Sequence, residues 1–540
     1  MAVVVAATLG FAWLSTRDGA EPAGYEERAC ALDQEIVERI ARGHDPIRSN
    51  DVTMVPKEPN FVGSFTLTSH SGPWDYVQNV PLVLYGPGYI SPAGRVDAGV
   101  DLTGVYPTMA DLFDLDLPPV DGRVLPNALD PRRPSSPPKL ALVVVWDGAG
   151  RSTLERWPNA WPTLKAMEEE GVSYVNATVG SSPSVTSATH STLGTGNYPS
   201  RHGITANDLR LDDGRVVEAF EDLAATKLRS ETFADEIDKR FDNESKVGLL
   251  AWVKWHVGML GHGEGSPGGD GDEMALVRYV DEVVVRGNED LFEVPEHITG
   301  AANIETLIDD LDREDGVLDG KWLENDIRLP EGTAPWNTYS NPAWARYQAK
   351  LTFRMLKSGS YGQDEVPDVL LTNFKMTDLA GHMWGIEAEE TREVLREQDK
   401  ALADILRYLD REVGDYIVVV TADHGASQLP TETGAWPIDQ KELIDDLEGR
   451  FGVSGKQDLI AESSASGLHL DREVAAQAEV SAHDVADFLN AYTIADNSTG
   501  ESLPEGYEDR GEELVMSAAF PASETNNLVA GCGGAQRAEE

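Results

Sequence analysis

Three apolar segments of the chain each lead into residues that can bind a metal ion. These residues are Asp147 in "KLALVVVWDG", Asp378 and His382 after "PDVLLTNFK", and Asp423 and His424 at the end of "DYIVVVTADHG". Continuous apolar and β-branched runs are typical of strands that are buried on both faces of a parallel sheet. The carboxyl ends of such strands meet at one edge of an open α/β sheet, where ligands bind. Because carboxylate and imidazole are the ligands of hydrolytic zinc sites, the sequence predicts a metal site at this edge.

A stretch rich in hydroxyl groups lies between the first and the second of these segments. Its sequence is "SSPSVTSATHSTLGTGNYPSRHGITAND", which places Thr186 four residues before His190. By itself this composition fits a solvated loop as well as a site for phosphate chemistry. The predicted metal site favours the second interpretation, because a metal ion favours the deprotonated, nucleophilic form of a bound hydroxyl group.

The elements that must position these residues alternate between strands and helices. The segment "WPTLKAMEEEG" is typical of a helix that ends at Gly171, and "EAEETREVLREQDKALADILRYLDREVG" is typical of a long amphipathic helix that ends at Gly414. This alternation predicts an α/β fold with a mostly parallel central sheet. The chain of 540 residues is long enough for a large core and more than one lobe.

The composition limits the partners of the protein. The sequence contains 93 Asp and Glu residues against 44 Lys and Arg residues, which gives a formal net charge of −49. A surface this acidic repels nucleic acids and anionic membranes, so neither is an expected partner. A small phosphorylated substrate remains compatible with this charge, because a buried metal ion can dominate the local field. The two cysteines form no CxxC pair, which argues against a thiolate metal site.

The N-terminus carries an apolar run of 14 residues, 2–15, and its first basic residue is Arg17. This length is short for a membrane-spanning helix, which needs about 20 residues, but it suits the core of a signal peptide. We therefore expect residues 1–24 to be a signal peptide or an anchor. The protein would then be exported and be extracellular, periplasmic or attached to the cell surface. A buried N-terminal helix is the alternative.

Together, these motifs resemble the alkaline phosphatase superfamily, in its nucleotide pyrophosphatase/phosphodiesterase-like branch, and most closely the phosphate-irrepressible alkaline phosphatases. That branch carries a metal-binding Asp after the first strand, a Thr nucleophile, D-x-x-x-H and D-H-G. The resemblance implies an alkaline phosphatase-like fold with helices on both faces of the sheet. It also implies that Thr186 is the nucleophile, at a helix N-terminus that favours a phosphoryl oxygen. Asn207, in "GITAND", would hold a phosphate oxygen, and His190 would have a structural role.

The same resemblance requires one more histidine ligand. The segment "FTLTSHSGPWDYVQNVPLVLYGPGYI" (65–90) is similar to the family's "TTHGSPYDYDxxVPLLFYGPG", which normally lies near the C-terminus, and it makes His70 the missing ligand. His469, in "SGLHLDRE", matches a small strand that is remote from the metals, so we expect it to pack there. This order of segments implies a circular permutation of the family's sequence. The alternative is an unrelated N-terminal domain with His70 in a surface turn.

The resemblance implies two zinc ions as cofactors. The ligands of the zinc ion on the nucleophile side would be Asp147, Thr186, Asp423 and His424. The ligands of the other zinc ion would be Asp378, His382 and His70.

The permuted order also sets the expected domains. These are a signal peptide or anchor (1–24), a permuted C-terminal lobe (25–130), a Pro/Ser-rich linker (131–138), a main catalytic domain (139–530) with a cap insertion at about 208–341, and a tail (531–540). In this arrangement the segments that hold Cys30 and Cys532 would be neighbours. A disulfide between them and two unrelated thiols are both possible at this point.

The segment around Lys254, "AWVKWHVGMLGHG", bears on the substrate. It is similar to the family's "SLKDRxAxxxxGH", in which the Lys contacts phosphate in the members that cleave monoesters, but His256 replaces the companion Arg. The main hypothesis is therefore a zinc-dependent hydrolase of phosphate monoesters that acts through a phosphothreonine. The alternatives are a phosphodiesterase or nucleotide pyrophosphatase on the same scaffold and a non-catalytic metal-binding surface protein. The acidic segment "GGDGDE" (268–273) could bind Ca²⁺ through Asp270 and Asp272, but it lacks the remaining ligands of a Ca²⁺ loop, so we expect a solvated acidic turn.

Overall fold

A computed structural model describes residues 24–63, 66–70, 72–277, 287–328, 339–453, 457–498 and 502–536. Within these residues, eight strands form a large central sheet. In spatial order they are β10 (Glu273–Leu276), β9 (Val247–Ala251), β13 (Asp368–Phe374), β5 (Leu140–Trp146), β14 (Tyr416–Thr421), β3 (Leu82–Tyr85), β6 (Val172–Thr178) and β4 (Gly94–Asp101). All run parallel except β3, which is antiparallel to both of its neighbours. The predicted mostly parallel α/β sheet is confirmed.

The middle of this sheet is formed by the three apolar segments that the sequence marks as strands. Every residue of β5, β13 and β14 is buried. Such strands need apolar side chains on both faces, because helices cover both sides of the sheet.

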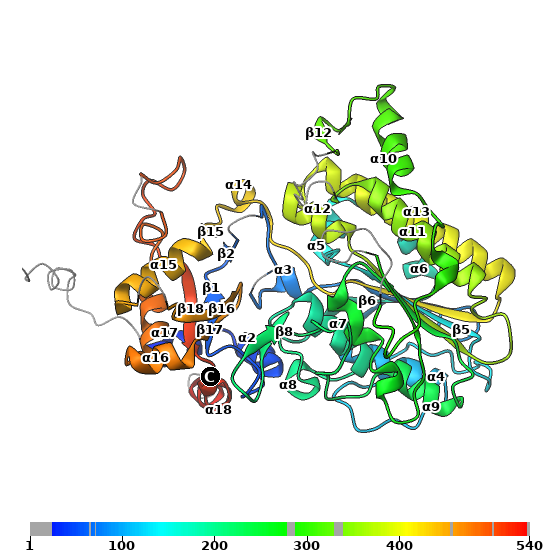
Figure 1. Cartoon of the computed structure of the whole chain (residues 1–540), viewed down its shortest axis with the longest axis horizontal. Helices are drawn as coiled ribbons and strands as arrows, with labels where there is room; N and C mark the ends of the chain where they lie inside the picture. The colour runs from blue at the N-terminus through cyan, green and yellow to red at the C-terminus, as the bar shows by residue number, and fades with distance from the viewer. Residues whose placement is uncertain are drawn as a thin grey trace, which may run out of the picture.

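Helices do cover both faces, as predicted (Figure 1). One face carries α6 (Pro162–Glu170), α11 (Pro342–Ser358), α12 (Met376–Trp384) and α13 (Glu389–Glu412). The other face carries α4 (Val105–Leu112), α7 (Thr186–Thr195), α8 (Pro199–His202) and α9 (Phe233–Arg240). The helix α13 shows why these helices bind the sheet, since its buried residues include Val394, Leu402 and Leu409 on one side while charged residues face solvent.

A second, antiparallel sheet lies at the end of the molecule shown at the left of Figure 1. Its strands, in spatial order, are β16 (Ile460–Ser464), β17 (Gly467–Leu470), β1 (Val52–Pro56) and β18 (Met516–Pro521). The helices α15 (Gln440–Phe451), α16 (Arg472–Gln477) and α17 (Ala482–Ala491) form the rest of this part. Because β1 lies between β17 and β18, the two ends of the chain build this sheet together.

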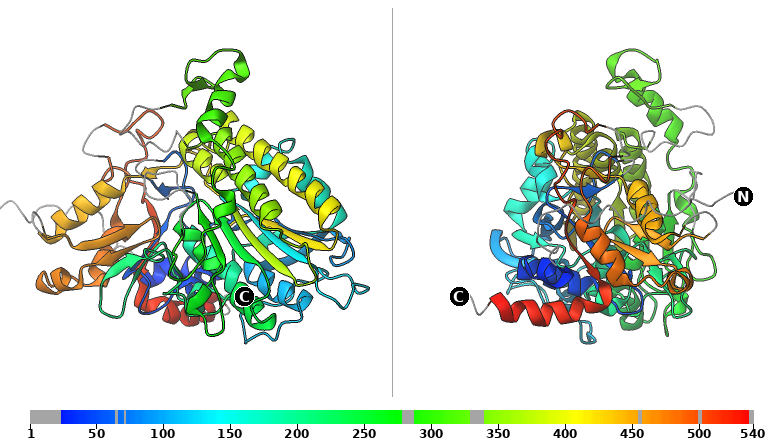
Figure 2. Two further views of the ribbon diagram at one scale, coloured as in Figure 1. Left: turned by 45° about the vertical axis from the view of Figure 1, so that its right-hand side comes forward. Right: turned by 90° about the vertical axis from the view of Figure 1, so that its left-hand side faces the viewer.

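The ends of the described chain also meet in a helical cluster. The helices α1 (Tyr25–Cys30) and α2 (Gln34–Gly43) contact α18 (Thr525–Gln536), as the right-hand view of Figure 2 shows for the blue and red helices. Cys30 and Cys532 form a disulfide. The expected proximity of these two segments is confirmed. The predicted tail needs correction, because α18 continues to Gln536 and buries Cys532.

The strand β3 confirms that the N-terminal segment shares the sheet with "DYIVVVTADHG". It pairs with β14 in the register Val83 to Val420.

The predicted cap at 208–341 is wrong in part, because this range supplies β9 and β10 to the sheet itself. The reason is the apolar run in "KVGLLAW", which is buried throughout β9. Beyond it, α10 (Ile304–Asp312), β11 (Lys321–Trp322) and β12 (Asn325–Asp326) project from the helix layer (Figure 1).

No helix within the described ranges is long and apolar enough to cross a membrane. The apolar run at 2–15, which we predict to be a signal peptide or anchor, lies outside these ranges.

Candidate active site

The predicted metal ligands lie together at the carboxyl edge of the large sheet. Asp147 directly follows β5, Asp423 and His424 follow β14, and Asp378 and His382 lie one turn apart on α12. The strands β13, β5 and β14 are neighbours and run parallel, so their carboxyl ends deliver these side chains to one place. The prediction that three separate segments meet is therefore confirmed, whereas the role of each residue stays a prediction.

The turn after β5 brings two of these carboxylates close together. Gly148 has a φ of +69°, and a Cβ atom there would lie 2.8 Å from the Cα atom of Asp378. Glycine is required here both by the backbone conformation and by this close approach. The Gly148 N–H also donates a hydrogen bond to Oδ1 of Asp423 at 3.1 Å. Gly148 thus allows Asp378 to approach the turn closely, and its N–H group holds the carboxylate of Asp423 beside this turn.

The ligand atoms form two groups that share one histidine. In the first group, Asp147, Asp423 and His424 each offer an atom within 4.8 Å of the others. In the second group, His70, Asp378 and His424 do the same. His70 comes from the segment before β3, and its ring stacks on that of His424 with 3.7 Å between the centroids. The structure therefore brings His70 to the site although it precedes the other ligands in the sequence.

Backbone carbonyl groups fix the orientation of the three histidines. A carbonyl oxygen can only accept a hydrogen bond, so Nδ1 of each ring carries the proton and Nε2 carries the lone pair. The Nδ1–H groups donate over 2.9 Å, from His70 to Ser184, from His382 to Thr68 and from His424 to Gly425. This is the tautomer that a metal ion bound at Nε2 requires.

Two buried ligand atoms lack a hydrogen bond in the described part of the chain. They are Nε2 of His424 and Oδ2 of Asp423, which lie 3.4 Å apart. Buried polar atoms normally have a partner, so this pair fits a bound cation between an imidazole and a carboxylate. The donor set and its orientation thus fit a zinc centre.

Lys375, which none of the sequence motifs marks, lies at the centre of the site. Its Nζ atom is 2.8 Å from Oδ1 of Asp147, 2.9 Å from Oδ2 of Asp378 and 3.3 Å from Oγ1 of Thr186. Burial works to lower the pKa of Lys375, but the surrounding carboxylates raise it above its ordinary value, so the ammonium group stays charged. The signal was present in the sequence, because Lys375 follows β13 and precedes Asp378 by one helical turn.

A second set of polar residues contacts the other side of Asp147. Its Oδ2 atom accepts a hydrogen bond from Nδ2 of Asn373 at 2.9 Å and lies 3.2 Å from Nε2 of His256. His190, expected to be structural, donates from Nδ1 to the carbonyl oxygen of Thr186 at 2.8 Å. No sequence motif marks Asn373, and in the sequence His256 stands only as the replacement of an arginine. These residues hold Asp147 and the first turn of α7 in place.

The pKa values follow from burial and from neighbouring charges. Burial, aided by the carboxylate of Asp147, raises the pKa of Asp423 to about 7. Burial also works to raise the pKa of Asp147, but Lys375 and the hydrogen bond from His256 hold it below its ordinary value. Burial and the adjacent His424 keep the pKa of His70 well below its ordinary value. Metal ligation needs neutral imidazoles and ionised carboxylates, and a bound cation favours the ionised form of Asp423.

The predicted nucleophile and phosphate ligands lie on and beside α7. Thr186 is the first residue of this helix and is buried. Asn207 accepts a hydrogen bond from the N–H of Ser187 at 3.1 Å, which places its side-chain amide beside the first turn. Lys254 begins the 3₁₀ helix η2 (Lys254–Met259), which packs along α7, and its ammonium group contacts the carboxylate of Glu218.

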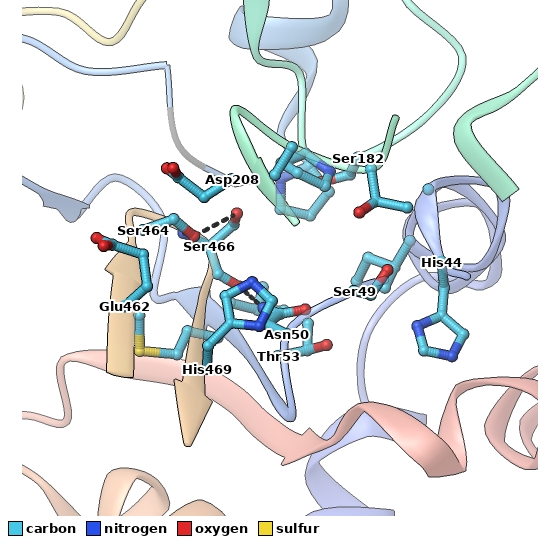
Figure 3. Close-up of a pocket in the computed structure, with 18 residues that line it drawn as sticks. His44, Ser49, Asn50, Thr53, Ser182, Asp208, Glu462, Ser464, Ser466 and His469 are labelled. Atoms are coloured by element: carbon cyan, nitrogen blue, oxygen red, sulfur yellow. Dashed lines mark hydrogen bonds between the residues drawn. The ribbon is translucent and has the colours of Figure 1, made fainter. Parts of the chain in front are cut away.

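His469 lies away from these groups, as expected. It is a buried residue of β17 that faces a cavity between the small sheet and the segments around Ser182 and Asp208 (Figure 3). The volume of this cavity is about 40 Å³, enough for a few water molecules but not for a nucleoside or a sugar. His469 therefore packs in the small sheet, and the cavity is no subsite for a large leaving group.

Comparison with known proteins defines the class of the enzyme. Residues 141–519 match the type I phosphodiesterase / nucleotide pyrophosphatase family model. The chain belongs to this family and, with it, to the alkaline phosphatase superfamily, so the protein is a hydrolase of phosphoric esters. The resemblance inferred from the sequence is confirmed. The match begins in β5 and leaves out the segment that holds His70, so the circular permutation stays a prediction.

Individual relatives are distant. The alkaline phosphatase PafA of Elizabethkingia meningoseptica is 25% identical over 410 residues, which are 65% of this chain and 72% of that protein. A protein of Myroides odoratus named calcium-transporting ATPase is 24% identical over 407 residues, which are 65% of this chain and 71% of that protein. The crystal structure of wild-type PafA matches 71% of this chain and 84% of its own, with 19% identity and a TM-score of 0.49.

Proposed function

We propose that this enzyme is a zinc-dependent hydrolase of phosphate monoesters and that Thr186 forms a phosphothreonine during turnover. The observation that carries this proposal is the position of Thr186. Thr186 is the first residue of α7, and its hydroxyl oxygen lies 3.3 Å from Nζ of Lys375. It therefore lies within the set of carboxylates and histidines described above.

The proposed ligands of the zinc ion on the nucleophile side are Asp147, Thr186, Asp423 and His424. The proposed ligands of the other zinc ion are Asp378, His382 and His70. When bound, such a pair of ions supplies Lewis-acid stabilisation for the attacking and leaving oxygens of an in-line displacement.

Individual residues of the chain have separate roles in the proposed reaction. Thr186 attacks phosphorus, the alcohol leaves, and water hydrolyses the resulting phosphothreonine. Oδ1 of Asn207 is engaged with the N–H of Ser187, so its Nδ2–H₂ group is the part that can donate to a phosphate oxygen. The ammonium group of Lys375 stabilises negative charge on the oxygen of Thr186. The N-terminal end of α7, at which the N–H of Ser187 already bonds Asn207, adds a positive dipole end that favours an anion.

The choice between monoesters and diesters depends on the phosphate-facing cations. Lys254 supports monoesters, because their extra negative charge gains from a cation in the transition state. The missing arginine and the contact between Lys254 and Glu218 both reduce the positive charge available there. A phosphodiesterase or nucleotide pyrophosphatase on the same scaffold is therefore the second candidate, and the family is named for these activities.

We also propose that the protein is exported and circularly permuted. The disulfide between Cys30 and Cys532 supports an oxidising compartment. The contacts of His70 with Ser184 and His424, together with the place of β3 beside β14, support the permuted order.

The test is a comparison of initial rates on 4-nitrophenyl phosphate and on bis(4-nitrophenyl) phosphate, with zinc restored after chelation. The proposal predicts a higher kcat/KM on the monoester and two zinc ions per chain. A higher value on the diester would select the second candidate. Stable zinc binding without turnover of any phosphate ester would show a non-catalytic protein. A single zinc ion per chain would contradict the proposed pair of zinc ions.

A further inference from the structure

A second group of carboxylates lies outside the active site. It consists of Asp238 on α9 and of Asp270 and Asp272 in the loop before β10, and one oxygen from each lies within 4.8 Å of the others. The sequence predicted a solvated turn at 268–273. That prediction is wrong at Asp272, which is 4% exposed, and the helix residue Asp238 beside it is 0% exposed. The third carboxylate, Asp238, lies on a helix about 30 residues earlier in the chain, so no sequence motif links it to Asp270 and Asp272.

Three carboxylate oxygens of the buried members have no hydrogen-bond partner among the residues that the structure describes. Within the described residues, neither carboxylate oxygen of Asp238 accepts a hydrogen bond, and Oδ2 of Asp272 accepts none. An ionised carboxylate that is buried without a partner costs several kcal/mol, so buried carboxylates are normally paired with a cation or bound to a metal.

The nearby cationic side chains are already engaged elsewhere. Lys239 follows Asp238 on α9, but its ammonium group is held by Glu231 and Glu236. His262 contacts Asp235 at 2.9 Å. The neighbouring side chains of Glu264 and Glu293 add further negative charge.

The pKa values agree with a group of carboxylates that needs a cation to be ionised. Burial, followed by the charges of Asp270 and Asp235, raises the pKa of Asp238 to about 8. Burial and the charge of Asp238 hold the pKa of Asp272 well above its ordinary value. These carboxyl groups thus need either protons or a metal ion near neutral pH.

We propose that Asp238, Asp270 and Asp272 bind one Ca²⁺ ion. All three offer oxygen, which suits a hard cation such as Ca²⁺ or Mg²⁺ rather than zinc. Ca²⁺ takes six to eight oxygen ligands in a flexible geometry, whereas Mg²⁺ requires a near-ideal octahedron and keeps several waters. Three carboxylates that come from a loop and a helix fit the flexible coordination of Ca²⁺ better than the octahedron of Mg²⁺.

The ion would stabilise the position of one loop of the catalytic part, residues 261–272. Residues 261–272 connect η2, which holds Lys254 and His256 beside α7, to the edge strand β10. A cation shared with α9 would tie this loop to the helix layer. It would act on stability and would leave the zinc ligands untouched, because the two sites have no residue in common.

The test uses the zinc-loaded enzyme after traces of calcium are removed with a chelating resin. Ca²⁺ is titrated in competition with a chromophoric calcium chelator, for the wild type and for Asp238→Asn, Asp270→Asn and the control Asp213→Asn, which changes an exposed turn. One site is expected in the wild type and in the control. Both variants of the site should lose at least 100-fold in affinity, with zinc content and kcat unchanged.

Thermal unfolding gives a second readout, because the effect of Asp238→Asn on the unfolding temperature should change sign when Ca²⁺ is added. Without Ca²⁺, Asp238→Asn should unfold at a higher temperature than the wild type, because it removes charge repulsion. With saturating Ca²⁺ it should unfold at a lower temperature, because it loses a ligand. The inference is overturned if the wild type binds no more Ca²⁺ than the Asp238→Asn variant. An equal stabilisation of that variant with and without Ca²⁺ would also overturn it and would show shared protons instead. If Asp238→Asn does not fold, the titration of Asp270→Asn, which alters a half-buried loop residue, decides alone.

Discussion

Replacing Lys375 with methionine should separate the two roles that its position implies. Methionine keeps the length of the side chain but removes the charge that lies 2.8 Å from Asp147 and 2.9 Å from Asp378. Removing one partner of a buried ion pair costs about 3–5 kcal/mol, because the other charge is left uncompensated. We expect a loss of stability of this size in the zinc-free protein. Bound zinc ions would compensate the same carboxylates, so the loss should be much smaller in the zinc-loaded protein.

The catalytic effect of this variant can be estimated separately. The contact between Nζ of Lys375 and Oγ1 of Thr186 is a charged hydrogen bond, and its loss costs about 1.5–3 kcal/mol. This corresponds to a decrease in kcat of about 10- to 150-fold.

The assay is thermal unfolding with and without zinc, together with kcat on 4-nitrophenyl phosphate. Lys357→Met, which changes an exposed lysine of α11, is the matched control. An equal loss of stability with and without zinc would refute the idea that Lys375 and the metal ions neutralise the same carboxylates. An unchanged kcat would refute its role at Thr186.

Three further predictions concern the phosphate, the permutation and the disulfide. Lys254→Ala should slow monoester cleavage by about 10- to 150-fold, from the loss of a charged hydrogen bond, and diester cleavage much less; equal losses in kcat/KM on both substrates would make Lys254 structural. His70→Ala should lower the zinc content and the activity, whereas His469→Ala should lower only the thermal stability; the opposite pattern in metal analysis would mean that the chain follows the ordinary order of the family. Cys30→Ser removes the bond to Cys532 and should cost about 2–4 kcal/mol in unfolding free energy while kcat stays the same, so a large loss of kcat in the folded variant would contradict a purely structural role.

The sequence predicted the sheet and its main ligands because their signals are local. The apolar, β-branched runs of β5, β13 and β14 mark buried strands, and a polar residue at the end of such a strand points to the ligand edge of an α/β sheet. Asp147, Asp378 and Asp423 could therefore be placed together before any coordinates were known. His70 required the additional comparison with a family motif, because nothing local connects it to the other ligands.

The features that the sequence does not reveal depend on contacts between distant segments. The position of Lys375 after β13 is visible in the sequence, but its contacts with Asp147 and Thr186 come from distant segments. Asp238 is one of 93 acidic residues, and only the fold of the loop onto α9 buries it beside Asp272. The strand β10 is short and follows a glycine-rich loop, so its pairing with β9 was not visible as a periodic pattern.

The most direct test of the central claim is the turnover of Thr186→Ala together with its zinc content. Thr186 supplies at most one ligand oxygen, so the variant should still bind zinc through its carboxylates and histidines. We predict that its kcat on 4-nitrophenyl phosphate falls by at least about 10³-fold, while Thr186→Ser, which keeps a hydroxyl group, retains measurable turnover. Activity within tenfold of the wild type in zinc-loaded Thr186→Ala would contradict the account and would move the search for the nucleophile to Ser184 and Ser187.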